Sequence, residues 1–88
     1  MGATVKLPKW GLTMEEATLN EWLVPVGGRV EQGQVIATLE SEKVEMEMPS
    51  PVAGLVAEYL VQAGETVAVG TPLLVIVKDE HELAEYRR

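Results

Sequence analysis

The sequence predicts a small all-β protein, a sandwich or barrel in which two similar halves close on each other. Two observations carry this prediction: the chain contains an internal repeat with a period of 37 residues, and each copy holds short apolar runs separated by glycine turns. Short strands at regular spacing with turn signals between them are typical of small sandwiches and barrels. Two copies are too few for a solenoid array, so we expect one domain made of two related halves.

The repeat places residues 18–40 on residues 55–77, and it sets Trp22 opposite Tyr59. Each copy has a β-rich run, a glycine turn, a short link that contains valine, a second glycine and a second apolar run. We expect the glycines to hold backbone geometry in turns, because glycine alone adopts positive φ without steric cost. The expected structural turns lie at Gly27, Gly33, Gly54, Gly64 and Gly70.

Residues 14–23 carry a competing signal. Thr13 and Glu16 resemble a helix capping box, and Leu19 and Leu23 have helical spacing. The repeat favours a strand instead, because the equivalent segment 55–61 follows a glycine and is β-rich.

The apolar pattern stops at Lys78. We therefore assign residues 1–78 to the domain and residues 79–88 to a polar tail or the start of a linker. This tail has the composition of a short helix, a frayed end or a linker.

Composition excludes several classes of function. The chain has no cysteine, so disulfides and thiolate metal sites are impossible. A net charge of −7 without clustered Lys or Arg argues against nucleic acid. The one histidine, His81, leaves almost no scope for a catalytic triad, so we do not expect an enzyme. The apolar runs are too short to span a bilayer, and we expect a soluble cytoplasmic protein without membrane contact.

A charged hairpin is predicted between the two copies. Residues 44–48 alternate Val or Met with Glu, which predicts a strand with one face inward and one in water. The preceding strand should end near Leu39 or Glu40, so residues 41–43 turn the chain and Lys43 lies at the tip. The turn lacks Asn-Gly and Asp-Gly, which favours a type I turn over the primed two-residue types.

Lys43 is predicted to be a target of modification and not a catalytic amine. The carboxylates of Glu40, Glu42, Glu45 and Glu47 surround it in sequence and favour its charged form, which is a poor nucleophile. Calcium binding is disfavoured because the EF-hand spacing is missing and the lysine repels a cation. The residues alone leave open a hairpin tip whose charges serve only solubility.

Three segments together resemble a known family. They are Glu40-Ser41-Glu42-Lys43-Val44, Met48-Pro49-Ser50-Pro51-Val52-Ala53-Gly54 and Leu7-Pro8-Lys9-Trp10-Gly11-Leu12-Thr13-Met14-Glu15-Glu16. They resemble the lipoyl domains of 2-oxo acid dehydrogenase acyltransferases, and the match runs from about Val5 to Val77. The family often has Asp and Ala beside the lysine, where this chain has Glu42 and Val44.

The resemblance implies a flattened barrel of two four-stranded antiparallel sheets with quasi-twofold symmetry. It also implies that Lys43 carries lipoate as N6-lipoyl-lysine, at the end of the domain opposite the termini. Ligase and partner enzymes would recognise the residues around this lysine. We assign this recognition to Glu40, Glu42, Val44 and Glu45.

The implied activity is that of a swinging-arm carrier without an active site of its own. A lipoate-attaching enzyme would load Lys43, and a thiamine-dependent decarboxylase would reductively acylate the dithiolane. The acyl group would pass to coenzyme A at the acyltransferase core, and a flavin-dependent dihydrolipoyl dehydrogenase would reoxidise the arm.

Two other functions are weighed against the lipoyl carrier. A biotinyl-carrier domain shares the fold but usually has Met on both sides of its lysine. An unmodified β-sandwich that binds a protein partner through the hairpin belongs to a different class. The longer glycine-cleavage carrier has helical segments that this chain lacks. The sequence leaves open which 2-oxo acid complex is served, and whether the domain stands alone or begins a longer acyltransferase.

Overall fold

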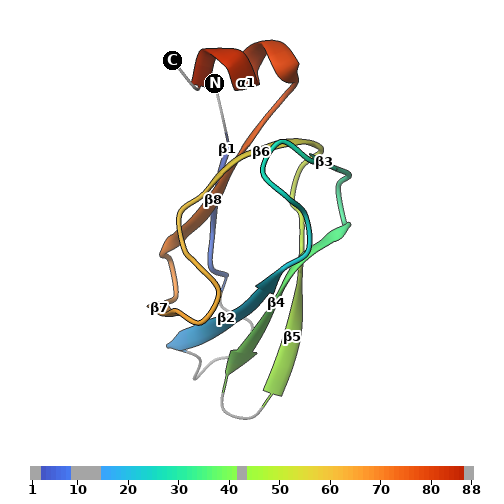
Figure 1. The fold of residues 1–88 in the computed structure, drawn as a ribbon. Helices are drawn as coiled ribbons and strands as arrows, with labels where there is room; N and C mark the ends of the chain where they lie inside the picture. Colours follow the sequence, from blue (N-terminus) through green and yellow to red (C-terminus); the bar gives the residue numbers. More distant parts are fainter. Residues whose placement is uncertain (1–2, 9–14, 42–43, 87–88) are drawn as a thin grey trace.

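Eight strands and one short helix make up the described part of the chain, residues 3–8, 15–41 and 44–86 of a computed structural model (Figure 1). The strands are β1 (Ala3–Lys6), β2 (Glu16–Trp22), β3 (Arg29–Val30), β4 (Val35–Ser41), β5 (Val44–Pro49), β6 (Gly54–Tyr59), β7 (Thr66–Ala68) and β8 (Pro72–Val77). The helix, α1, spans Glu80–Tyr86. The molecule is elongated, with extents of 40 × 22 × 20 Å.

The strands form two four-stranded antiparallel sheets. One sheet has the order β1-β8-β6-β3 and the other has the order β5-β4-β2-β7. Each strand of the first sheet has its equivalent at the same place in the second: β1 and β5, β8 and β4, β6 and β2, β3 and β7. This arrangement confirms the predicted all-β flattened barrel with quasi-twofold symmetry.

Residues that are 37 positions apart in the sequence occupy equivalent positions in the two halves of the backbone. The pairing of β2 with β4 shifts register between Leu19 and Glu21, and that of β6 with β8 shifts between Val56 and Glu58. The turns repeat as well: the Gly27 N–H donates to the Val56 carbonyl, and the Gly64 N–H donates to the Leu19 carbonyl, both at 2.7 Å. Residues 16–22 are therefore a strand, as the repeat indicated, and not a helix.

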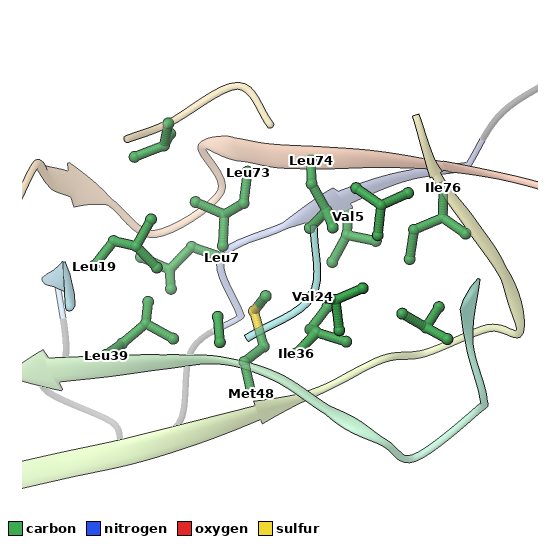
Figure 2. Close-up of a cluster of buried hydrophobic side chains, with 14 of the residues drawn as sticks. Val5, Leu7, Leu19, Val24, Ile36, Leu39, Met48, Leu73, Leu74 and Ile76 are labelled. Carbon is green, nitrogen blue, oxygen red and sulfur yellow. The ribbon is translucent and has the colours of Figure 1, made fainter. Parts of the chain in front are cut away.

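The core lies between the two sheets. Figure 2 shows side chains of β2, β4 and β5 facing side chains of β1 and β8 across the interior. Leu19, Leu39 and Leu74 are fully buried, and Met48 anchors β5 with only 1% of its surface exposed. Burying aliphatic side chains of this size contributes about 1.5–3 kcal/mol each.

The Trp22 and Tyr59 rings, which the repeat aligns, stack on each other. Their centroids are 4.2 Å apart and their planes differ by 12°. The indole Nε1 of Trp22 donates to the Val61 carbonyl at 2.9 Å. The side chains of two symmetry-related positions thus form one contact between the halves, worth about 0.5–1.5 kcal/mol beyond its burial.

Helix α1 packs against β6 and β8, and it lies at the top end of the molecule in Figure 1. Its Leu83 is buried, 8% exposed, in a second apolar cluster of Leu55, Ala57, Val75 and Val77. Of the forms considered for residues 79–88, the structure therefore has the short helix, and this helix packs against the sheet. Nowhere in the described residues is there a helix with the length and apolar character needed to cross a membrane.

Hydrogen bonds hold both ends of α1. Asp79 Oδ1 accepts from the Glu82 N–H at 3.0 Å, and Glu82 Oε1 accepts from the Lys78 N–H at 2.9 Å. The first bond satisfies a backbone donor that the first helical turn leaves unpaired, and the second connects the helix to Lys78, which lies before it in the chain. At the other end the Tyr86 hydroxyl donates to the Glu58 carboxylate on β6.

Candidate carrier hairpin

The β4–β5 hairpin is the candidate functional site. Its pairing runs from Val35 opposite Pro49 to Ser41 opposite Val44, so the two residues Glu42 and Lys43 connect the strands. β4 thus extends one residue beyond the predicted end at Leu39 or Glu40. Glu42 and Lys43 themselves lie outside the described residues, and the predicted type I turn and the predicted exposure of the lysine stay predictions.

The side chains of the hairpin are buried at its base and become more exposed toward Val44. Leu39 and Met48 are buried, Met46 is half-buried, and Val44 is 58% exposed. In Figure 1 β4 ends and β5 begins at the bottom of the view, the end opposite α1. The described ends of the hairpin are thus held by buried residues at the base and are exposed at Val44 and Glu45.

Two carboxylates face each other beside the tip. Glu40 on β4 is directly opposite Glu45 on β5, and both side chains are exposed. Like charges opposite each other on antiparallel strands are destabilising. A pair that costs folding free energy at this position is more consistent with recognition of another molecule than with a stabilising role.

Next to the hairpin the surface has an acidic hollow of about 270 Å³. It is lined by Glu15, Glu16, Ala17, Thr18, Glu40, Ser41 and Thr66. The lining has three carboxylates and no Lys or Arg, so the potential on this side of the hairpin is negative and favours cationic groups. Nowhere in the described residues, this hollow included, do three His, Asp or Glu side chains come together in a way that could hold a metal ion.

Two hydroxyl hydrogen bonds cross the same end of the sheet. Ser41 Oγ donates to the Glu16 carbonyl at 3.0 Å, which ties β4 to β2. Thr18 Oγ1 and Thr66 Oγ1 are 2.7 Å apart and tie β2 to β7. Ser41 was not singled out in the sequence, although a hydroxyl residue two positions before the target lysine was a visible signal.

The glycines assigned to structural turns differ in geometry. Positive φ values are found at Gly27 (88°), Gly33 (89°), Gly64 (95°) and Gly70 (91°). Gly54 instead is the first residue of β6, where it pairs with Val30. Its requirement is space, because a Cβ at Gly54 would lie 2.2 Å from the Val77 carbonyl oxygen.

His81, the one histidine, is far from the hairpin. It lies on α1 with 84% of its side chain exposed, and its Nε2 is 3.9 Å from a carboxylate oxygen of Glu85. It faces solvent at the end of the domain opposite the start of β5 (Figure 1).

Comparison with known proteins identifies relatives over most of the chain. The family model described as "Biotin-requiring enzyme", which covers biotin- and lipoyl-attachment domains, matches residues 3–76. The chain is 40% identical over 72 residues to the dihydrolipoyllysine-residue succinyltransferase component of the 2-oxoglutarate dehydrogenase complex of Staphylococcus saprophyticus, covering 82% of this chain and 17% of that protein. It is also 40% identical over 76 residues to the dihydrolipoyllysine-residue acetyltransferase component of the pyruvate dehydrogenase complex of Haemophilus influenzae, covering 86% of this chain and 13% of that protein.

Two solved structures share the fold. The lipoyl domain of the 2-oxoglutarate dehydrogenase complex of Azotobacter vinelandii superposes with a TM-score of 0.70 at 26% identity, covering 86% of this chain and 96% of that one. A single-chain, multi-domain long-chain acyl-CoA carboxylase superposes with a TM-score of 0.69 at 25% identity, covering 94% of this chain and 8% of that one. The chain spans less than one fifth of the length of the two curated relatives. It belongs to the biotin- and lipoyl-attachment domain family, and within that family it is a lipoyl domain of the kind found in 2-oxo acid dehydrogenase acyltransferases.

Proposed function

We propose that this domain carries lipoate on Lys43 and moves acyl groups and electrons between the active sites of a 2-oxo acid dehydrogenase complex. The observation that carries the proposal is the β4–β5 hairpin, whose Ser41–Val44 pair leaves only Glu42 and Lys43 to connect the strands. The domain has the fold of a lipoyl domain, and β4 ends and β5 begins at the end of the molecule opposite α1 (Figure 1).

The residues around the connection fit a covalently attached arm. An amide-linked arm needs a lysine that an attaching enzyme can reach and that neighbouring side chains do not cover. Ser41 is small, Val44 is 58% exposed, and Glu45 is exposed. When attached, the lipoyl dithiolane supplies the redox and acyl-transfer chemistry.

The protein's own part is to hold the arm and to restrict where it goes. Leu39 and Met48 fix the hairpin to the core, so the arm starts from a rigid point. Tethering a reactive group to partner enzymes raises its effective concentration without any new contact. The curated relatives are longer than this chain, and we propose that the tether belongs to the remainder of such a protein.

We propose that the acidic hollow and the Glu40–Glu45 pair steer the domain toward partners with basic entrances. These partners are the lipoate-attaching enzyme, the thiamine-dependent decarboxylase, the acyltransferase core and dihydrolipoyl dehydrogenase. Exposed charges act over about 10 Å at moderate salt and are screened as ionic strength rises. Reductive acylation of the lipoylated domain should therefore slow when Glu40 and Glu45 become Gln, and high salt should shrink this defect. A defect that is independent of salt would replace steering with direct contact.

Loading with lipoate or with biotin tests the proposal. The purified domain is incubated with ATP and either lipoate plus a lipoate ligase or biotin plus a biotin ligase, and intact mass and peptide mapping are recorded. We expect one lipoyl group on Lys43 and no biotin. Lys43→Arg should abolish loading, whereas the control Lys78→Arg, beyond the end of β8, should load like wild type.

Other results would overturn the proposal in distinct ways. A wild-type domain that takes biotin as readily as lipoate would favour the biotinyl-carrier alternative. Loading that persists in Lys43→Arg would assign the site to another lysine. No loading by either enzyme would favour the unmodified protein-binding module.

A further inference from the structure

We infer that Ser41 is a positioning residue for lipoate attachment, because its hydroxyl hydrogen-bonds the end of β4, two residues before Lys43 in the sequence, to β2. The inference rests on the proposed function for its biological consequence. The hydrogen bond from Ser41 Oγ to the Glu16 carbonyl, here called the tie, joins two described residues. Ser41 is not among the recognition residues assigned from the sequence.

The backbone pairing between β2 and β4 ends before the last residue of β4. The paired residues of β2 and β4 run from Trp22 opposite Ala37 to Thr18 opposite Glu40. β2 continues for two more residues toward the tip, to Glu16, but its backbone partner there is Ala68 of β7. The last residue of β4, Ser41, is thus beyond the end of the β2–β4 ladder.

The alternation of backbone groups along β2 sets the direction in which the Glu16 carbonyl points. Backbone groups of successive residues in a strand face alternate neighbours. The Glu15 carbonyl accepts from the Val69 N–H, and the Leu19 N–H donates to the Glu65 carbonyl, so odd-numbered residues of this stretch face β7. The Glu16 carbonyl therefore faces β4, where Ser41 Oγ donates to it at 3.0 Å.

The other contacts of β4 near Ser41 hold it less firmly. On its other side β4 pairs with β5, which is an edge strand and has no further neighbour in its sheet. The facing Glu40 and Glu45 carboxylates repel each other one residue pair below the Ser41–Val44 pair. A side-chain hydrogen bond from β4 to the inner strand β2 opposes this loosening at the place where the chain leads into Glu42 and Lys43.

We expect this hydrogen bond to restrict the conformational freedom of Lys43. An attaching enzyme must bring the amine to a fixed reacting carbon, and a group that is already held in place loses less freedom on binding. Without the tie the domain should bind less productively, while the bound lysine, held by the enzyme, should react at the normal rate. Loss of Ser41 Oγ should therefore raise KM for the domain and leave kcat nearly unchanged.

The test compares Ser41→Ala, Ser41→Thr and the control Tyr86→Phe. Ser41→Thr keeps a hydroxyl at the same position, and Tyr86→Phe removes the exposed hydroxyl that hydrogen-bonds α1 to Glu58 of β6, far from the hairpin. Amide hydrogen exchange of residues 44–46 reports the tie without any modification. Steady-state lipoylation by a lipoate ligase, followed by intact mass, reports its consequence.

In Ser41→Ala we expect exchange at residues 44–46 to accelerate roughly fivefold, the factor that a net hydrogen bond of about 1 kcal/mol supplies. KM for the domain should rise by roughly the same factor. Ser41→Thr and Tyr86→Phe should behave like wild type in both measurements.

Unchanged exchange in Ser41→Ala would overturn the tie. Faster exchange with unchanged lipoylation would overturn its role in positioning. A wild-type domain that is not lipoylated would refute the proposed function, and the exchange result would still decide whether Ser41 holds the hairpin.

Discussion

Replacing Gly54 by alanine should destabilise the domain far more than the same change at Gly33. At Gly54 the new Cβ would lie 2.2 Å from the Val77 carbonyl oxygen and 2.9 Å from Ile76 Cγ2. The first neighbour is backbone at the last pair of the β6–β8 ladder, where Leu55 is opposite Val77. Because this backbone cannot yield without breaking the ladder, the cost should reach the upper end of overpacking, about 3 kcal/mol.

At Gly33 the cost has a different origin. Its φ is +89° and nothing lies within 4 Å of the position where a Cβ would be added. The penalty is then that of placing an L-residue in the left-handed region, about 1 kcal/mol. Gly70 is the symmetry-related position with φ +91° and the same open surroundings, so Gly70→Ala should cost the same as Gly33→Ala.

Thermal unfolding followed by circular dichroism measures these costs. For a domain of this size 1 kcal/mol lowers Tm by roughly 4–8 °C, so Gly33→Ala and Gly70→Ala should each lose that much. Gly54→Ala should lose roughly 12–24 °C. A Gly54→Ala protein as stable as Gly33→Ala would show that β8 moves aside easily, and the steric reasoning would be wrong.

The remaining predictions concern α1. Leu83→Ala should cost about 2 kcal/mol in urea unfolding and expose an apolar patch that binds a hydrophobic dye. Backbone hydrogen bonds lower the pKa of Asp79 and of Glu82 below their usual 3.8 and 4.5, so their stabilisation of α1 is present above these values and is lost as pH falls through the lower folded-state pKa values. Helix signals in NMR spectra should therefore fade in acid, less so in Asp79→Asn. The hydrogen bond to Glu58 raises the pKa of Tyr86 above 10.0, so this contact should be lost as pH rises through the raised value; a Tyr86→Phe domain with the same alkaline transition as wild type would contradict this.

Much of the architecture was predictable because the repeat carries long-range information. Aligning residues 18–40 with residues 55–77 identified equivalent strands and favoured a strand over a helix at residues 14–23, which the structure confirms for residues 16–22. The alignment also paired Trp22 with Tyr59, but it could not reveal that the rings touch. A repeat shows that two positions are equivalent, whereas contact requires that both lie close to the symmetry axis.

The docking of α1 was harder to predict because its own sequence is mostly polar. A visible signal was on the other side of the contact. The run from Leu73 to Val77 is continuously apolar, which is typical of a strand that is covered on both faces. Such a run predicts that something covers the outer face of β8. It does not identify α1 as that cover, because Leu83 is the only buried residue that the helix supplies.

The two symmetric halves differ in the residues on their outer faces. β4 and β8 are equivalent strands, yet the repeat aligns Thr38 with Val75 and Glu40 with Val77. The valines are buried under α1, whereas Glu40 is exposed beside the hairpin tip. An apolar side chain on an outer face adds stability only where another element covers it, as α1 covers Val75 and Val77. The polar residues on β4 are therefore those of an uncovered face, which leaves the hairpin open to the partner enzymes that we propose for it.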